Sequence, residues 1–110
     1  MSSSNIKIVQ KGWGYEKWIC NTEEYCGKLL HIIKGKKCSW HYHTLKDETF
    51  YLQEGKLLVK YSDDDDREKA KELIMERGDK FHVYRGLRHQ MYALEAVSYT
   101  HLTLPTIYSV

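Results

Sequence analysis

The residues from Gly35 to Gly55 constrain the fold of this chain most strongly, because they combine His41, His43 and Glu48 with two turn-forming glycines. His41 and His43 are two residues apart, so on a β-strand both imidazoles point to the same face. Glu48 opens a second β-rich run and would lie across from the histidines if the two runs form a hairpin. Two imidazole nitrogens and a carboxylate suit a divalent first-row metal ion. The stretch therefore predicts paired strands that carry a metal site.

A second glycine-marked segment, which begins with the turn at Gly78, offers a fourth ligand in His89. The two segments together resemble the motifs of the cupin superfamily. The first cupin motif, Gly, five residues, His-x-His, three or four residues, Glu, six residues, Gly, is matched at every position. In the second motif Gly78, Gly86 and His89 match, while Tyr84 replaces a proline and Ala93 an asparagine. Both departures lie at positions that are not metal ligands.

The resemblance covers roughly residues 28 to 93 and implies a cupin-type double-stranded β-helix, a jelly-roll barrel. The spacing of turn signals, every eight to twelve residues, also indicates an all-β sandwich or barrel. By resemblance, the metal ligands are His41, His43, Glu48 and His89. Four ligands leave about two positions open on a six-coordinate ion, for water or substrate oxygens. The cofactor is expected to be one divalent transition metal ion: iron, manganese, nickel or zinc.

Composition limits the class of protein. The chain has 110 residues, enough for one domain with a single core. A net charge of +2 does not favour nucleic acid or a membrane surface as a partner. No apolar run approaches the roughly 20 residues that span a bilayer, and the start of the chain has no apolar signal-peptide core. We therefore expect a cytoplasmic protein whose three cysteines, Cys20, Cys26 and Cys38, are reduced.

We expect the chain to divide into three parts. Residues 1–10 form a flexible N-terminus with an edge strand at 6–9, and residues 11–96 form the cupin domain. Further strands are expected at 56–61 and 72–75, with a helical turn at 67–71. Residues 97–106 resemble the in-frame translation of a transposase-type DNA-sequencing adapter over ten consecutive residues. We therefore expect 97–110 to be a non-native tail, the barrel to be C-terminally truncated, and His101 not to be a ligand.

The function suggested by resemblance is that of a sugar or sugar-phosphate isomerase. The segment 12–18, with Trp13 and Trp18, is similar to the entry to the cupin domain of type II mannose-6-phosphate isomerases. In such an enzyme a metal ion polarises a carbonyl and a neighbouring hydroxyl, and a base moves the proton between them. Candidate catalytic groups for that proton are Lys80, Tyr51, His82 and Glu16. Candidate substrate-binding residues are Arg85, Arg88 and Glu16.

Two other functions fit the same residues. One is a non-catalytic module that binds a carbohydrate or nucleotide sugar in polysaccharide synthesis, and the other is an Fe(II)-dependent dioxygenase. All three functions imply a small-molecule ligand. For the isomerase and the binding module that ligand is a sugar or sugar phosphate. The region of Trp13 and Trp18 is also expected to support a homodimer.

Overall fold

The computed structural model of the protein describes residues 6–22, 24–44 and 46–105. Within these ranges the regular structure is almost entirely β. The nine strands are β1 (Lys7–Lys11), β2 (Gly14–Asn21), β3 (Cys26–Ile32), β4 (Lys46–Glu54), β5 (Lys56–Ser62), β6 (Lys71–Glu76), β7 (Lys80–Val83), β8 (Arg88–Ala93) and β9 (Val97–Pro105). One 3-10 turn, η1 (Arg67–Lys69), lies between β5 and β6. No helix in the described ranges is long and apolar enough to cross a membrane.

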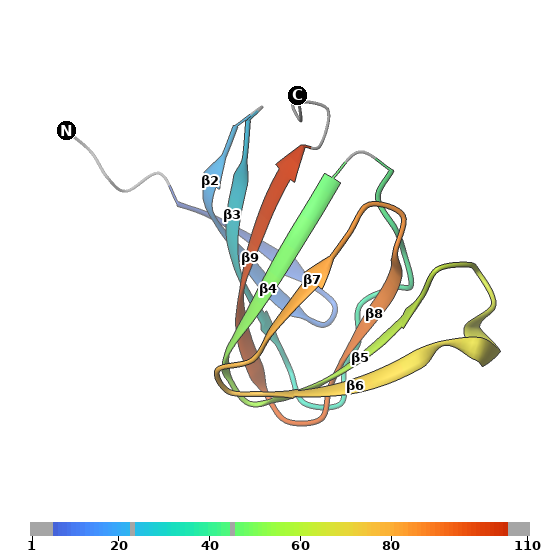
Figure 1. Ribbon diagram of the computed structural model, residues 1–110. Coiled ribbons are helices and arrows are strands. Elements are labelled where there is room, and N and C mark those ends of the chain that lie inside the picture. The colour runs from blue at the N-terminus through green and yellow to red at the C-terminus, as the bar shows by residue number, and fades with distance from the viewer. Residues whose placement is uncertain (1–5, 23, 45, 106–110) are drawn as a thin grey trace.

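The strands form two antiparallel sheets that face each other (Figure 1). The larger sheet has the order β1-β2-β3-β9-β4-β7, and the smaller one the order β6-β5-β8. The chain therefore changes sheet four times, between β4 and β5, β6 and β7, β7 and β8, and β8 and β9. This arrangement confirms the predicted all-β jelly-roll barrel.

The core lies between the two sheets and follows from alternation along the strands. In β4 the side chains of Glu48, Phe50 and Leu52 point inward and are buried, because successive side chains of a strand point to opposite faces. The other strands contribute apolar residues with the same period of two. The buried apolar residues are Leu30, Ile32, Phe50, Leu52, Leu57, Val59, Met75, Val83, Leu87, Met91, Ala93, Val97 and Tyr99.

Several local predictions are confirmed. The first strand lies at an edge of the larger sheet and pairs only with β2. The expected helical turn is present as η1, which follows a run of four aspartates at 63–66; the Asp66 side chain accepts a hydrogen bond from the Glu68 amide and caps the turn. Cys20 and Cys26 lie in the two strands of the β2–β3 hairpin and, like Cys38, have free thiols here, while the reduced state in the cell stays a prediction.

The expected hairpin between the histidine segment and the Glu48 strand is wrong. Residues 36–43 run in an irregular, extended path beside β8, where His41 and His89 exchange both backbone hydrogen bonds at 3.0–3.1 Å. They do not pair with β4, because both edges of that strand are already taken by β7 and β9. The histidine pair therefore belongs to the side of the barrel opposite Glu48.

The structure also differs from the expectation that no strand follows residue 96. Residues Val97–Pro105 form β9, which lies in the middle of the larger sheet between β3 and β4. The segment has a period of two after all: Val97, Tyr99 and Thr103 are buried, while Leu102 is 54% exposed. Valine, tyrosine and threonine are also favoured in strands. The alternation is hard to see in the sequence because hydroxyl-bearing residues occupy both inward and outward positions of the strand.

We predict that Gly55, the last glycine of the first motif, tolerates no side chain. Its φ is +93°, and an added Cβ would lie 2.2 Å from the carbonyl oxygen of Ala96. Gly55→Ala is therefore expected to lower the free energy of unfolding by about 2–4 kcal/mol in urea titrations. Gly78→Ala is the control, because Gly78 has a similar φ of +94° with nothing within 4 Å of the added Cβ. Equal losses in the two variants would contradict the steric explanation.

Candidate metal centre

Both sheets contribute side chains to one polar cluster inside the barrel. Glu48 comes from β4 of the larger sheet, and His89 comes from β8 of the smaller one. His41 and His43 come from the extended segment beside β8. One ligand atom from each of the four residues lies within 4.8 Å of the others. The structure thus brings together all four predicted ligands, although the pairing that does so is not the predicted hairpin.

Backbone carbonyl groups orient two of the imidazoles. The Nδ1 atom of His41 lies 2.9 Å from the Ser39 carbonyl oxygen, and the Nδ1 atom of His89 lies 2.9 Å from that of Leu87. A carbonyl oxygen can only accept, so each Nδ1 must carry the proton and donate it. The Nε2 atoms then present free lone pairs to the cluster, the arrangement that metal-binding histidines usually have.

Two buried atoms fit a metal ion as their missing partner. Glu48 is 2% exposed and His89 is 1% exposed. Among the described residues, the Nε2 atom of His89 is buried without a hydrogen-bond partner, and the Oε1 atom of Glu48 has no neighbour of this kind beyond the His43 imidazole. Orphaned buried polar atoms are costly unless a partner is supplied. A divalent cation held by three imidazoles and a carboxylate would supply that partner for both atoms.

The charge of Glu48 is maintained by its neighbours. Burial raises the pKa of this carboxyl group, but hydrogen bonds and positive charge from His101 and His43 outweigh burial and hold the pKa below its usual range. His43 Nε2 lies 2.5 Å from Glu48 Oε1, and His101 Nε2 contacts Oε2. Burial lowers the pKa of His89 to about 4. At neutral pH the cluster therefore has an ionised carboxylate and a neutral His89, the forms that bind a metal ion.

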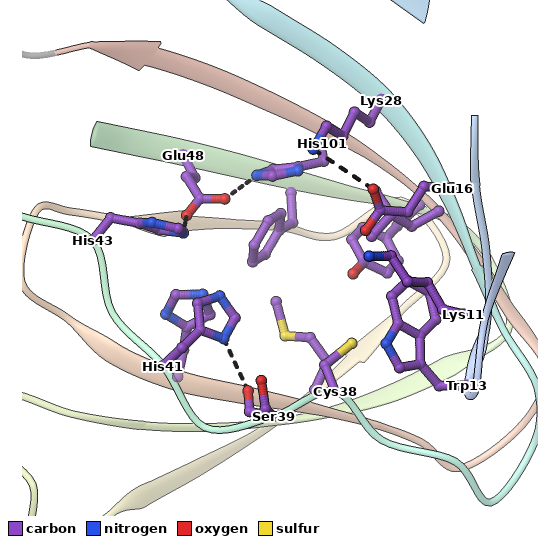
Figure 2. A pocket seen from close by; sticks show the side chains of 15 residues that line it. Lys11, Trp13, Glu16, Lys28, Cys38, Ser39, His41, His43, Glu48 and His101 are labelled. Carbon is purple, nitrogen blue, oxygen red and sulfur yellow. Dashed lines mark hydrogen bonds and ion pairs between the residues drawn. The ribbon is translucent and has the colours of Figure 1, made fainter. Parts of the chain in front are cut away.

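The cluster opens into a pocket of about 290 Å³ (Figure 2). In Figure 2 the imidazoles of His41 and His43 lie at one end, and Lys11, Glu16 and Lys28 lie at the other. The lining residues are Lys11, Trp13, Glu16, Lys28, Leu30, Cys38, Ser39, His41, His43, Glu48, Phe50, His89, Met91, Tyr99 and His101. The pocket therefore extends well beyond the four candidate ligands.

Two other ionisable groups in the wall are neutral at ordinary pH. Burial raises the pKa of the Cys38 thiol to about 11. Burial also raises the pKa of Tyr99 well above its usual value. Neither group is suited to accept a proton at neutral pH, because each already holds its own.

Of the candidates for proton transfer or substrate binding, the structure places only Glu16 on this pocket. Its carboxylate accepts a hydrogen bond of 2.8 Å from Trp18 Nε1 and lies 3.6 Å from Lys28 Nζ. Tyr51, Lys80 and His82 are exposed on the outer face of the larger sheet. The register explains this: Tyr51 pairs with Lys80 and Thr49 with His82, while the alternate positions point inward.

The two candidate arginines lie in and beside the second-motif turn, outside the pocket. Arg85 is exposed, and its amide donates to the side chain of Asp47 at 3.1 Å. Arg88 precedes the inward-pointing His89 and faces the other way. Its guanidinium donates to Asp65 Oδ1 and the Gly86 carbonyl, both at 3.0 Å, and lies over the ring of Tyr42. Its contacts secure the turn that leads into β8.

Tyr84, which stands where the cupin motif has proline, also helps to hold this turn. Its phenol donates a hydrogen bond to Asp63 in the acidic loop after β5. The Gly86 amide donates to the His43 carbonyl at 2.7 Å. Side-chain and backbone contacts thus restrain the turn where a proline ring would otherwise do so. Ala93, in place of the motif asparagine, is fully buried in the core.

Sequence reasoning missed the two lysines of the pocket, Lys11 and Lys28. The signal was present in the alternation of β3, where Lys28 shares a face with Leu30 and Ile32. A lysine in register with core residues indicates an ammonium group that faces the interior. Lys11 had no comparable signal, because it lies at the end of a short edge strand.

Comparison with known proteins agrees with this geometry. Residues 28–102 match the cupin domain family. The chain belongs to this family. No curated protein matches it in sequence. The family match includes both segments that carry the four candidate ligands.

Three solved structures illustrate the shared fold. KdgF from Halomonas sp. has a TM-score of 0.76 at 19% identity, with 92% of this chain and 87% of that chain covered. An RmlC-like cupin from Shewanella frigidimarina has a TM-score of 0.78 at 17% identity, with 96% and 88% covered. Bacillus subtilis oxalate decarboxylase, which has Mn(II) centres, has a TM-score of 0.79 at 20% identity. The alignment covers 99% of this cupin but only 30% of that chain, so it spans about a third of the decarboxylase.

Proposed function

We propose that this cupin is a metal-dependent enzyme that moves a proton between neighbouring carbons of a small sugar or sugar phosphate, as an isomerase does. The observation that supports it is the convergence of His41, His43, Glu48 and His89 at one end of a pocket that also contains Glu16. A bound divalent ion would polarise a carbonyl and an adjacent hydroxyl of the sugar and so acidify the hydrogen between them. Iron, manganese, nickel and zinc all suit this set of ligands.

Glu16 is the group proposed to move the proton. Among the groups considered for this role, it alone combines a pocket position with a carboxylate that is not part of the cluster. The hydrogen bond from Trp18 and the ion pair with Lys28 hold one of its oxygens, Oε1. The other oxygen is left to take a proton from one carbon and return it to the neighbouring carbon. The proposal replaces Lys80, Tyr51 and His82 with Glu16, because those three face away from the pocket.

The proposal includes a cytoplasmic homodimer. Apolar side chains on the larger sheet support the dimer: Ile8 on the edge strand β1, Ile19 on β2 and Leu102 on β9 are each more than half exposed. Exposed apolar groups that gather on one sheet indicate a surface that another chain covers. Ile19 lies in the region where the sequence predicted self-association, although the side chain of its neighbour Trp18 contacts Glu16 and Lys28 of the pocket.

We further propose that residues 97–110 are not native and that β9 stands in the place of a natural strand. The support is the ten-residue resemblance of 97–106 to translated adapter sequence. Sequencing of the source DNA across codon 96 is expected to show that the gene encodes other residues than these after that codon. An unchanged reading from an adapter-free library would contradict this proposal and would make His101 a genuine neighbour of Glu48.

Metal content tests the cluster. Elemental analysis of the purified protein is expected to find about one transition metal ion per chain, and His41→Ala and His89→Ala are expected to lose it. His31→Ala is the control, because His31 stacks on Tyr15 and contacts Ser98 away from the pocket. His101→Ala is expected to keep the metal, since His101 is not among the four clustered ligands. Retention of metal by His89→Ala would disprove the assigned site.

Proton exchange tests the reaction. Wild-type protein incubated with sugar phosphates in D₂O, mannose 6-phosphate among them, is expected to introduce deuterium next to the carbonyl carbon, as followed by NMR. Glu16→Gln should slow this exchange by about 100-fold or more, because it removes the proton acceptor and keeps the shape. Glu24→Gln, in the exposed β2–β3 turn, should have no effect. Ligand binding without exchange would favour the non-catalytic module, and oxygen consumption with iron would favour a dioxygenase.

A further inference from the structure

The end of the pocket opposite the imidazoles is formed by Lys11, Glu16 and Lys28, which point inward from β1, β2 and β3 (Figure 2). We propose that this lysine end binds an anionic group, a carboxylate or a phosphate, of a small ligand whose other end reaches the metal ligands. The inference rests on the proposed function and specifies its substrate class as acidic sugar derivatives.

The charges at the lysine end favour an anion. Glu16 lies 3.6 Å from Lys28 Nζ and so offsets one of the two ammonium groups. Lys11 makes no hydrogen bond or ion pair with the described residues, and Figure 2 shows its ammonium group directed into the pocket. The ammonium group of Lys11 is therefore available to a ligand. A divalent ion at the other end would make the whole lining net positive, since Glu48 offsets only part of its charge.

Lys28 is held in position before a ligand arrives. Its side chain is 21% exposed, and its ammonium group lies 4.6 Å from the centroid of the Trp18 ring. The cation–π contact and the ion pair with Glu16 restrict a side chain that is otherwise very flexible. Pre-positioning lowers the entropy lost when the ligand binds. Trp18 thus acts as a support for the pocket, since it contacts both Glu16 and Lys28.

The size of the pocket restricts the ligand. A volume of about 290 Å³ lies at the lower limit of the roughly 300–1,000 Å³ typical of small-molecule sites. A single sugar acid or sugar phosphate suits this volume better than an oligosaccharide. Lysine binds either anion as a point charge, without the bidentate geometry that would select one of them. The experiment therefore has to distinguish carboxylate from phosphate.

The test compares three sugars with the same ring: glucose, glucuronate and glucose 6-phosphate. Calorimetric titration of zinc-loaded wild-type protein is expected to show at least one of the two anionic sugars binding about tenfold or more tightly than glucose. The sugar that binds more tightly, glucuronate or glucose 6-phosphate, shows whether the lysine end prefers a carboxylate or a phosphate. Lys28→Met and Lys11→Met should each reduce this preference severalfold, because methionine keeps most of the apolar side chain and removes the charge. Lys34→Met, in an exposed turn, is the control and should keep it.

The His89→Ala variant separates this inference from the proposed function. A preference that disappears in His89→Ala but persists in both lysine variants would place the anion on the metal ion, which overturns the lysine end and leaves the proposed function in place. A preference that disappears only in the lysine variants would support the lysine end and leave the metal-dependent reaction to the proton-exchange measurement. Equal binding of all three sugars, or binding of none, would overturn the inference. Circular dichroism and thermal unfolding should show that each variant is folded.

Discussion

The structure depends on keeping one carboxylate ionised inside a β-barrel. Glu48 is almost completely buried, and an isolated charge in such a place would be very costly. His43 makes the charge tolerable by contact with one of its oxygens, and His101 of β9, a strand that we propose is not native, contacts the other. The neighbouring His89 is equally buried and has an unpaired Nε2 atom. Burial of these polar groups lowers the stability of the barrel. Perturbed ionisable groups of this kind cluster at functional sites.

The two ends of the pocket differ in chemistry. One end presents lone pairs from imidazoles and a carboxylate, and the other presents ammonium groups. Between them lie apolar and neutral groups, among them Phe50, Met91 and the protonated thiol of Cys38. A wall of this kind lets the two charged ends act on a ligand without cancelling each other. The orientation of a bound molecule would then follow from its own charge distribution.

The sequence was sufficient for the fold class and for the identities of the four clustered residues. The spacing of the two motifs carries that information, because each glycine, histidine and glutamate has a local role in a turn or a strand. The pairing of His41 with β8 could not be predicted, since it depends on which strand edges remain open after the sheets form. For the same reason Tyr51, Lys80 and His82 seemed near the site: sequence distance is short there, but register directs them outward. Lys11 was missed because its place in the pocket arises only when β1 adds to the sheet.

The four candidate ligands are divided between the two sheets, and this has a mechanical consequence. Glu48 belongs to the larger sheet, whereas His89 belongs to the smaller one and the segment with His41 lies beside it. An ion bound by all of them would be a cross-link between the halves of the barrel, added to the apolar core that already joins them. Separation of the sheets and release of the ion would then be a single event. The lifetime of the bound ion would therefore depend on how often the two sheets separate, and not on the motion of any one side chain.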